Sequence, residues 1–446
     1  MQTAMNQGWV IHPAKNGLNG TFRAPGDQTV GQWALLCGLL AVGESHISGM
    51  LETADFSHLV TAIRALGGQA TRLAPGHWRI AGRGLGGLAE PSRALQIGRS
   101  AGLAHQLAGL LASHPIFAVL DGEARLGKTG THRLLSALRA TGARLRARDR
   151  GLPLAIIGAA DTLPLDVHLP VPSANIKAAL LLAGLNASGL SRIVEPEATP
   201  DHGEIMLRRF GAHVAVQTEG RGRVVSLLGQ PELHAAEVTI PGDPDLAALP
   251  VLAALLVPGS HVTAHGVGLN PLRGALFDVL RQMGAALVTT HTHGGEEPIG
   301  DLVAVHSPLH AVETAWETAP ALVRSYPLLA VAAATATGST VLRGLGAVRP
   351  GERARMARVA ASLRQCGLQA DVDDDDLVVH GQSIPPHGGT HIDAPGDAFL
   401  AMAGLLTGLL ASAPVRVDQA DALNRVFPEF TCTLNTLLPS PVLEPA

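Results

Sequence analysis

The stretch AALLLAGLNASG (178–189) shows the pattern on which the whole chain is built. It is a run of small and branched apolar residues that ends at a glycine, and the β-rich segment SRIVEP (191–196) follows it. A second stretch, LRRFGA (207–212), then ends what its spacing predicts to be an amphipathic helix. This order predicts a buried helix, a strand, an amphipathic helix and further strands.

The same order recurs along the chain, which therefore contains an internal repeat. Aligned on Gly184, the apolar runs have their equivalent positions at Gly38, Gly109, Gly184, Ala254, Ala333 and Gly408. The second signature recurs with its glycine at Gly67, Gly142, Gly211, Gly284 and Gly367. Six units of alternating helices and strands predict an α/β fold, with three units in each of two domains.

Composition sets further limits on the class of protein. A chain of 446 residues is longer than one hydrophobic core usually organises, so two domains are expected on length alone. The net charge of −4 gives no general attraction to nucleic acid or to acidic membranes. Three distant cysteines form no disulfide framework, and the apolar runs are too short to span a bilayer. We therefore expect a cytoplasmic, monomeric protein.

Two glycine-rich motifs suggest nucleotide binding and need to be weighed. GEARLGKT (122–129) matches the P-loop pattern and includes Lys128, but its strand and helix occupy an ordinary place in the second repeat. GRGLGG (82–87) opens no helix, so it does not indicate a dinucleotide site. A P-loop nucleotide hydrolase is thus kept only as a minor alternative.

Several stretches resemble the 5-enolpyruvylshikimate-3-phosphate synthase family, in order, from about Ile11 to Phe430. They are PGDQTVGQWALL (25–36), PVPSANIKAALLLAGLNASG (170–189), EPEATPDHGEIMLRRFGA (195–212), IPGDPDLAALPVLAALLVPGS (240–260), VGLNPLRGALFDVLRQMGA (267–285) and SYPLLAVAAATATGSTVLRGL (325–345). The resemblance implies a two-domain inside-out α/β barrel with six βαβαββ-type repeats and a ligand cleft between the domains. The implied domains are 24–241, and 1–23 together with 242–446.

The family transfers the enolpyruvyl group of phosphoenolpyruvate to a hydroxyl of shikimate 3-phosphate, and it holds the anionic groups with Lys and Arg. Many of its motif positions carry other residues in this chain. In the opening motif PGDKS-x-x-x-R, Gln28, Thr29 and Trp33 replace Lys, Ser and Arg. Arg324 stands in place of the family's catalytic Asp, and Ala394 is among the residues that replace its D-H-R motif.

The replaced residues lead to an expectation about the reaction. Losing about five cationic contacts would remove roughly 8 kcal/mol, which is comparable to micromolar binding. We therefore expect not the ordinary reaction but an elimination, a dehydration or an altered transfer on a shikimate-like or cyclitol-like ring acid, in specialised metabolism. The alternatives are a carboxyvinyl transferase with unusual acceptor and donor contacts, and a non-catalytic ligand-binding or scaffolding homologue.

The resemblance also places candidate residues for catalysis. Glu352 occupies the family's proton-transfer position, and His105 and Tyr326 are further acid or base candidates. As an alternative, Glu352 in RPGERARM is simply an acidic residue in the first turn of a helix.

For ligand binding we expect relocated cations and helix-start polar groups around a small anionic ring acid. Arg99 and Arg324 form the predicted anion clamp, and Ser173 and Asn175 could bind the acceptor or merely cap a helix. The complete predicted binding set is Arg99, Ser173, Asn175, Arg324, Arg355, Arg425, Gln28, Thr29 and Lys128. No cofactor is expected, and His387, His391 and Asp393 lie in a loop context that does not favour a metal site.

Overall fold

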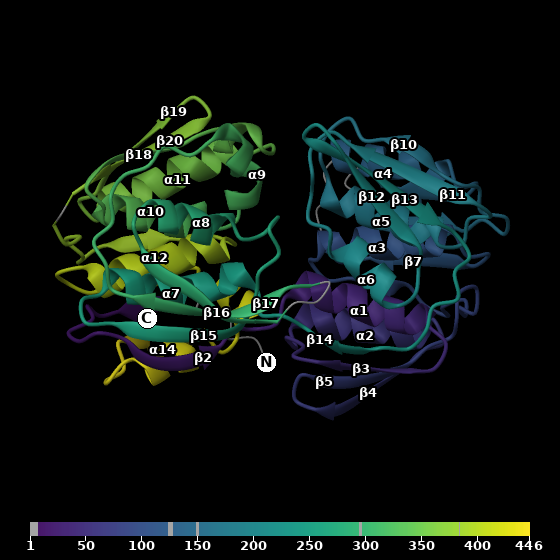
Figure 1. Ribbon diagram of the computed structural model, residues 1–446, viewed down its shortest axis with the longest axis horizontal. Helices are drawn as coiled ribbons and strands as arrows, with labels where there is room; N and C mark the ends of the chain where they lie inside the picture. The colour runs from purple at the N-terminus through teal and green to yellow at the C-terminus, as the bar shows by residue number, and fades with distance from the viewer. Residues whose placement is uncertain (1–7, 124–127, 149–150, 294–296, 383) are drawn as a thin grey trace. The chain divides into compact units, whose positions relative to one another are not determined.

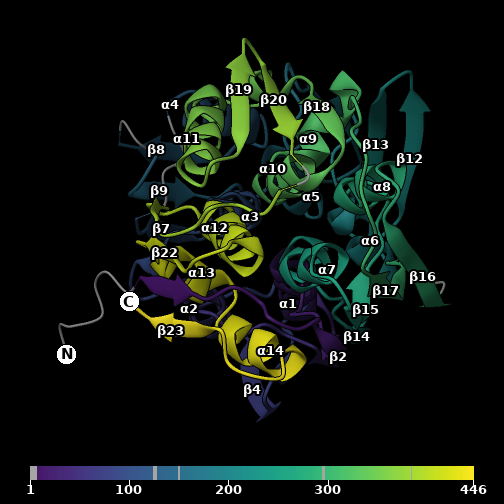
Figure 2. The same cartoon turned by 90° about the vertical axis from the view of Figure 1, so that its left-hand side faces the viewer.

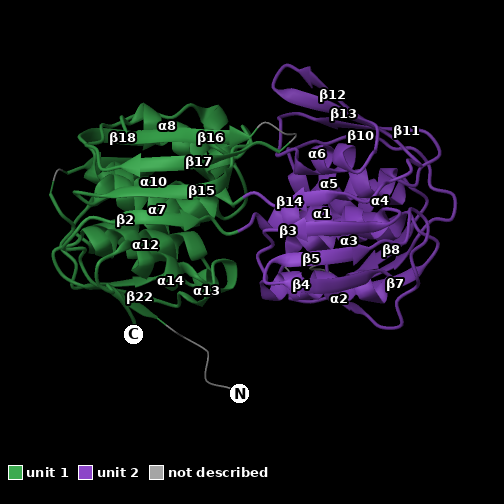
Figure 3. Cartoon of the chain, turned by 60° about the horizontal axis from the view of Figure 1, so that its bottom comes forward, with its two compact units in different colours: residues 1–25, 242–446 green, residues 26–241 purple. Residues whose placement is uncertain are grey.

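The computed structural model describes residues 8–123, 128–148, 151–293, 297–382 and 384–446. The chain divides into two compact units (Figures 1 and 3): unit 1 contains residues 1–25 and 242–446, and unit 2 contains residues 26–241. The first division falls at Pro25, two residues beyond the boundary expected from the sequence.

Unit 2 contains three of the repeats, and each repeat contributes one buried helix. These helices are α1 (Gln28–Leu40), α3 (Ala101–Ala112) and α5 (Ala174–Gly184). The second helices of the repeats are α2 (Ala54–Ala65), α4 (Lys128–Arg139) and α6 (His202–Arg209).

Strands surround these helices in three four-stranded sheets within the described part of unit 2. The sheet orders are β14-β3-β5-β4, β6-β7-β9-β8 and β10-β11-β13-β12. The strands are β3 (Glu44–Ser48), β4 (Gln69–Ala74), β5 (His77–Ala81), β6 (Leu95–Gln96), β7 (Phe117–Asp121), β8 (Arg144–Ala147), β9 (Leu154–Ile157), β10 (Asp166–His168), β11 (Leu190–Glu195), β12 (Val214–Glu219), β13 (Gly222–Leu228) and β14 (Glu237–Thr239). Because β14 pairs in parallel with β3, the last strand of the unit closes onto its first repeat.

Unit 1 has the same plan, with its buried helices surrounded by strands (Figure 2). The buried helices are α7 (Pro244–Leu256), α10 (Tyr326–Thr335) and α12 (Ala398–Leu410). The remaining helical segments are α8 (Ala275–Gln282), η1 (Trp316–Thr318), α9 (Ala319–Leu322), η2 (Leu345–Ala347), α11 (Glu352–Gln365), α13 (Asp421–Val426) and α14 (Phe430–Leu437).

The described strands of unit 1 form sheets of order β16-β17-β15-β2, β18-β20-β19 and β21-β22-β1-β23. They are β1 (Trp9–Ile11), β2 (Asn19–Arg23), β15 (His261–Gly268), β16 (Ala286–His293), β17 (Ile299–Val305), β18 (Gly338–Leu342), β19 (Gln369–Asp373), β20 (Asp376–Gly381), β21 (His391–Asp393), β22 (Val415–Asp418) and β23 (Leu443–Pro445). Strands β1 and β2 come from the start of the chain, which explains why unit 1 is built from two segments.

Small residues in the buried helices allow close packing. A Cβ added at Gly109 would lie 2.0 Å from the carbonyl oxygen of Ala179, so α3 and α5 approach each other backbone to backbone. Any side chain at this position would force the two helices apart. The recurring small residue therefore has a packing role in this repeat.

The second signature, with its Leu-Arg and Gly, also has a physical explanation. Its glycines adopt left-handed φ angles just after each second helix: 94° at Gly67, 95° at Gly142, 101° at Gly211, 88° at Gly284 and 79° at Gly367. This is the conformation that favours glycine at the end of a helix. The arginine of each signature donates to a carbonyl six residues later: Arg64 to Ala70, Arg139 to Leu145, Arg208 to Val214, Arg281 to Leu287 and Arg364 to Ala370. The signature thus ends the helix and ties it to the next strand.

The three Pro-Gly-Asp tripeptides, at 25–27, 241–243 and 395–397, lie directly before buried helices, where a Pro-Gly turn and an aspartate suit a helix start. Asp27 accepts from the backbone N–H of Thr29 at 2.7 Å, and Asp243 accepts from that of Asp245 at 2.8 Å. Asp397 accepts from two N–H groups at the start of α12. Each aspartate satisfies helix N–H groups that have no partner within the helix.

The surroundings of the P-loop motif do not match a nucleotide hydrolase. Strand β7 before the motif pairs antiparallel with β9, within a four-stranded sheet that belongs to the repeat. Residues 124–127 and the side chains of Lys128 and Thr129 lie outside the described residues, although α4 begins at Lys128. The sheet is therefore not the parallel sheet that a P-loop fold requires.

Candidate functional site

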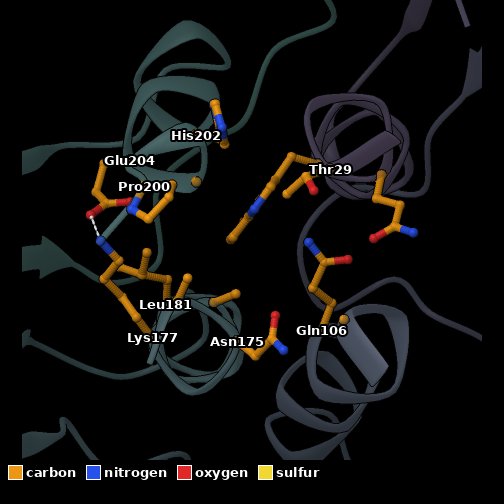
Figure 4. A pocket seen from close by; sticks show the side chains of 14 residues that line it. Thr29, Gln106, Asn175, Lys177, Leu181, Pro200, His202 and Glu204 are labelled. Carbon is orange, nitrogen blue, oxygen red and sulfur yellow. Dashed lines mark ion pairs between the residues drawn. The ribbon is translucent and has the colours of Figure 1, made fainter. Parts of the chain in front are cut away.

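Unit 2 contains a small polar pocket between the N-terminal halves of its helices (Figure 4). The pocket has a volume of about 60 Å³, and Thr29 of α1, Gln106 of α3 and Asn175 of α5 are among the residues that line it. The pocket is thus built from the helix starts of all three repeats, where polar side chains are expected to bind ligands or cap helices.

A buried ion-pair cluster forms one wall of this pocket. Lys177 Nζ lies 2.7 Å from Glu204 Oε1 and 3.2 Å from Glu195 Oε1, and the exposed fraction of all three side chains is 2% or less. Burial raises the pKa of Glu204, and the positive charge of Lys177 opposes this shift. Since one lysine faces two carboxylates, Lys177 is committed to internal partners and gives the pocket no free positive charge.

Trp33, in place of the family's arginine, gives the pocket an apolar surface. A Cβ added at Gly203 would lie 2.4 Å from the Trp33 ring, so the glycine makes room for the indole. Gln106 Oε1 is buried and has no hydrogen-bond partner within the described part of the chain. The pocket therefore offers an aromatic face and one unused acceptor.

The other predicted binding residues at the helix starts have local structural partners. Ser173 caps α5 by accepting from the Ile176 N–H at 3.3 Å, which is the capping role considered from the sequence. Gln28 donates to Thr53 Oγ1 at 3.1 Å. Asn175 and Thr29 remain directed to the pocket.

His105 and Arg99 each have a partner within unit 2. His105 is buried within α3, its Nδ1 lies 2.6 Å from the carbonyl oxygen of Ala101, and burial lowers its pKa. The acid–base role of His105 stays a prediction. Arg99 is largely exposed and pairs with Glu123 at 3.4 Å; its role in an anion clamp stays a prediction.

Unit 1 has a dense polar cluster at the starts of α10, α11 and α12, centred on Arg355. Arg355 Nε and Nη2 donate to the two carboxylate oxygens of Asp397 at 2.6 and 3.1 Å. Its Nη1 donates to Glu352 Oε1 at 3.1 Å and to the carbonyl oxygen of Val323, and Nη2 donates to the carbonyl oxygen of Arg324 at 3.2 Å. All five guanidinium donors are therefore used internally, which does not fit the substrate-binding role predicted for Arg355.

The two remaining catalytic candidates lie within the same cluster. Glu352 is 2% exposed, and its second oxygen accepts from Arg349 Nε at 2.6 Å. Tyr326 is fully buried with its ring 4.9 Å from the Arg355 guanidinium carbon, and burial raises its pKa. Glu352 is thus held between two arginines, whereas enclosure makes Tyr326 a poor proton donor or acceptor.

The aspartates at the start of α7 face two arginines. Arg324 Nη1 lies 3.4 Å from Asp245 Oδ2, and the guanidinium lies 5.1 Å from the centre of the Phe399 ring. Arg273 pairs with Asp243 and Asp245 at 3.3 and 3.0 Å. Since the Arg324 side chain is still 40% exposed, it retains access to solvent and to a ligand.

Two predicted binding residues, Arg425 and Lys128, are not part of the clusters above. Arg425 pairs with Asp421 within α13, and the side chain of Lys128 is not described.

The described residues contain no group of three or more metal-binding side chains, and none of the described helices is long and apolar enough to cross a membrane.

Comparisons with known proteins define first the class and then the family. The structure resembles the enolpyruvyl transferase NikO from Streptomyces tendae with a TM-score of 0.73, 20% identity and coverage of 99% of this chain and 100% of the other, which shows the fold. It resembles EPSP synthase from Acinetobacter baumannii with a TM-score of 0.90, 31% identity, and coverage of 99% and 100%. The predicted α/β inside-out fold of the enolpyruvyl transferase type is confirmed.

The sequence comparisons are equally extensive. The profile of the EPSP synthase (3-phosphoshikimate 1-carboxyvinyltransferase) family matches residues 13–434. The 3-phosphoshikimate 1-carboxyvinyltransferase of Granulibacter bethesdensis is 48% identical over 417 residues, 93% of this chain and 92% of that protein. That of Acidiphilium cryptum is 48% identical over 415 residues, 93% of both chains. The chain belongs to the EPSP synthase family.

These relatives correct the expectation of a changed reaction. Proteins of nearly full-length similarity carry the name of the ordinary carboxyvinyltransferase, so a dehydration or elimination in specialised metabolism is not supported. The error came from adding the lost cationic contacts as independent free energies. Contacts within one site are not additive.

Sequence reasoning missed how the polar residues pair with one another. Lys177, Glu195 and Glu204 are separated by 18 and 9 residues along the chain, and nothing in their spacing indicates that they meet. A usable signal existed for Asp397, because it ends the third Pro-Gly-Asp tripeptide. The tripeptide indicates a helix start with a capping residue, but it gives no sign of the contact with Arg355.

Proposed function

We propose that this chain catalyses carboxyvinyl transfer from phosphoenolpyruvate to shikimate 3-phosphate. The observation that carries this proposal is the nearly full-length similarity to proteins of that name, at 48% identity. The proposal includes four further properties. The enzyme is monomeric and cytoplasmic, binds two small anionic substrates and needs no cofactor.

Unit 2 supports a role in binding the acceptor. Ser173, Ala174 and Asn175 stand at the family's acceptor-binding motif S-[SA]-Q, with Asn175 in place of the glutamine, and Asn175 and Thr29 line the pocket. An amide and a hydroxyl can each donate to and accept from the hydroxyl groups of a ring acid. The Trp33 indole would contact the apolar face of the ring.

Unit 1 supports a role in proton transfer. In the addition the acceptor hydroxyl loses its proton to form the new C–O bond, and the terminal carbon of the enolpyruvyl double bond gains a proton. Departure of phosphate and loss of a proton from that carbon then restore the double bond, so the site needs a group that can give and take a proton. Glu352 occupies the family's proton-transfer position, and Arg349 and Arg355 fix both of its oxygens. A carboxylate held at two points is oriented without further loss of side-chain entropy.

The replaced motif residues affect how the substrate anions are bound. Arg349 and Arg324 keep exposed side-chain fractions of 50% and 40%, so they are the cations of the cluster best able to reach a phosphate or carboxylate. Exposed cations bind anions less strongly than desolvated ones. We therefore infer a weakly bound donor and a high KM for phosphoenolpyruvate.

The test is phosphate release by the purified protein, measured with both substrates together and with each alone. We expect release only when both are present. Glu352→Gln should lower kcat by about 10²- to 10⁴-fold, while Glu313→Gln, at an exposed glutamate paired with Arg343, should not. Release that needs only one substrate, or equal kcat in both variants, would contradict the proposal.

A further inference from the structure

Asp397 pairs with Arg355 in the geometry in which the carboxylate of a ligand pairs with an arginine. Asp397 Oδ2 accepts from Arg355 Nε at 2.6 Å and Oδ1 accepts from Nη2 at 3.1 Å. This parallel, two-point contact is the preferred geometry between a guanidinium and a carboxylate. The positive charge of Arg355 and its hydrogen bonds outweigh the effect of burial and lower the pKa of Asp397.

The edge of the guanidinium that Asp397 occupies is the one best suited to bind an external carboxylate. The remaining donors of Arg355 point to Glu352 and to the carbonyl oxygens of Val323 and Arg324, which belong to the walls of the cluster. The Asp397 and Arg355 side chains keep small exposed fractions, 13% and 8%. The pair is therefore buried, but it still reaches the surface of unit 1.

The charges around this pair are balanced by neighbours within unit 1. Arg349 pairs with Glu352, and Arg324 faces Asp243 and Asp245. Tyr326 lies against the face of the Arg355 guanidinium. An anion that approaches the cluster therefore competes with an internal carboxylate for each arginine, and most directly with Asp397 for Arg355.

We propose that Asp397 is a specificity-determining residue whose carboxylate occupies the two Arg355 donors that would otherwise bind the carboxylate of an anionic substrate. The proposal rests on the proposed function only in taking phosphoenolpyruvate as that substrate. Asp397 lowers the affinity of unit 1 for a carboxylate, because the ligand must displace it or bind to the more exposed arginines instead.

The substitution Asp397→Asn separates this role from helix capping. Oδ1 accepts from the N–H groups of Phe399 and Leu400, both at 3.1 Å, and an asparagine can keep this cap. Its amide nitrogen would then replace Oδ2 and place a donor against Arg355 Nε. The variant therefore loses the carboxylate charge and the contact of Oδ2 with Arg355 Nε, and it keeps only a neutral acceptor, Oδ1, for Nη2 and for the cap of α12.

The matched control is Asp376→Asn, in β20 of the same unit. Asp376 also combines an arginine with a backbone donor: it accepts from Arg343 Nη1 at 2.7 Å and from the Gly344 N–H at 2.8 Å. Both substitutions remove a carboxylate that pairs with an arginine, but only Asp397 faces Arg355. Stability effects common to both variants are thereby separated from effects on binding.

The experiment is calorimetric titration of phosphoenolpyruvate into wild type, both single variants and the double variant Asp397→Asn with Arg355→Lys. We expect Asp397→Asn to lower Kd about tenfold or more, since it removes the competing carboxylate charge and frees the Nε donor of Arg355. Asp376→Asn should leave Kd unchanged, and the double variant should lose the gain because lysine lacks the two-point fork. Inorganic phosphate, which has no carboxylate, should gain less than phosphoenolpyruvate.

An unchanged or higher Kd in a folded Asp397→Asn variant would overturn the proposal, as would a gain that persists in the double variant. If Asp397→Asn does not fold, Asp397→Ser keeps a capping hydroxyl without the carboxylate and gives the same test. The titration needs no turnover. Absence of catalysis in wild type would therefore overturn the proposed function and leave the assignment of Asp397 to be decided by binding.

Discussion

Each unit contains a buried cation between two carboxylates, but the two clusters differ in chemistry. In unit 2, Lys177 lies between Glu195 and Glu204, and in unit 1, Arg355 lies between Glu352 and Asp397. The pKa of Glu204 is raised, mainly by burial, whereas that of Asp397 is lowered because contacts with Arg355 outweigh burial. One ammonium faces two desolvated carboxylates in unit 2, whereas in unit 1 the five donors of Arg355 are joined by Arg349, which also pairs with Glu352.

The first and largest expected effect is that of Lys177→Met. Removing the lysine leaves two fully buried carboxylates uncompensated, so the free energy of unfolding of unit 2 should fall by about 3–5 kcal/mol. Urea unfolding followed by circular dichroism measures this change. Combining Lys177→Met with Glu204→Gln should recover part of the loss, and a loss below about 1 kcal/mol in the single variant would show that the cluster is not desolvated.

The substitution Arg355→Lys tests the other cluster and should have a smaller effect. Lysine keeps the positive charge but has three donors, so the two-point contact with Asp397 is lost. We expect the free energy of unfolding to fall by about 1.5–3 kcal/mol, which is the contribution of a hydrogen bond to a charged group. Wild-type stability in this variant, measured by the same urea method, would mean that charge alone holds the cluster together.

The opposite pKa shifts predict opposite pH dependences of stability. The stability that comes from the lowered pKa of Asp397 is present above the ordinary Asp value of about 4 and is lost as the pH falls through the folded-state pKa. The stability from the raised pKa of Glu204 is present below its ordinary value and is lost as the pH rises through the folded-state pKa.

Thermal unfolding of wild type, Asp397→Asn and Glu204→Gln between pH 3 and pH 8 measures both shifts. The difference between wild type and Asp397→Asn should shrink as the pH falls below about 4. The advantage of wild type over Glu204→Gln should shrink as the pH rises above about 4.5. Parallel curves for the three proteins would contradict both assignments.

The smallest effect is expected for Arg99→Ala. Arg99 and Glu123 have exposed side-chain fractions of 62% and 77%, and such a pair contributes little to stability. The melting temperature should stay within about 1–2 °C of wild type. A larger drop would show that Arg99 has a structural partner beyond this ion pair.

The fold could be predicted from the sequence because its signals are local and repeated. A glycine at the end of a helix, such as Gly211, and an aspartate before one, such as Asp27, each depend on a few neighbouring residues. The arginine of the recurring signature bonds only six residues away. Five copies of this signature and three of the Pro-Gly-Asp start constrain the architecture strongly.

The polar clusters could not be predicted in the same way. Arg355 and Asp397 are 42 residues apart, and only the packed helix starts bring them together. The replaced motif residues, such as Gln28 and Ala394, could be read from the sequence, but their effect on the reaction depends on contacts like these.

A single-turnover experiment tests the central claim, carboxyvinyl transfer by this chain, most directly. Saturating phosphoenolpyruvate removes weak donor binding as a cause of slow turnover, and enzyme in excess over shikimate 3-phosphate restricts the reaction to one turnover. ³¹P NMR follows both phosphorus-containing products. The account predicts one inorganic phosphate and one enolpyruvyl ether for each acceptor consumed. Unchanged substrates in the presence of folded protein that binds both of them would contradict it.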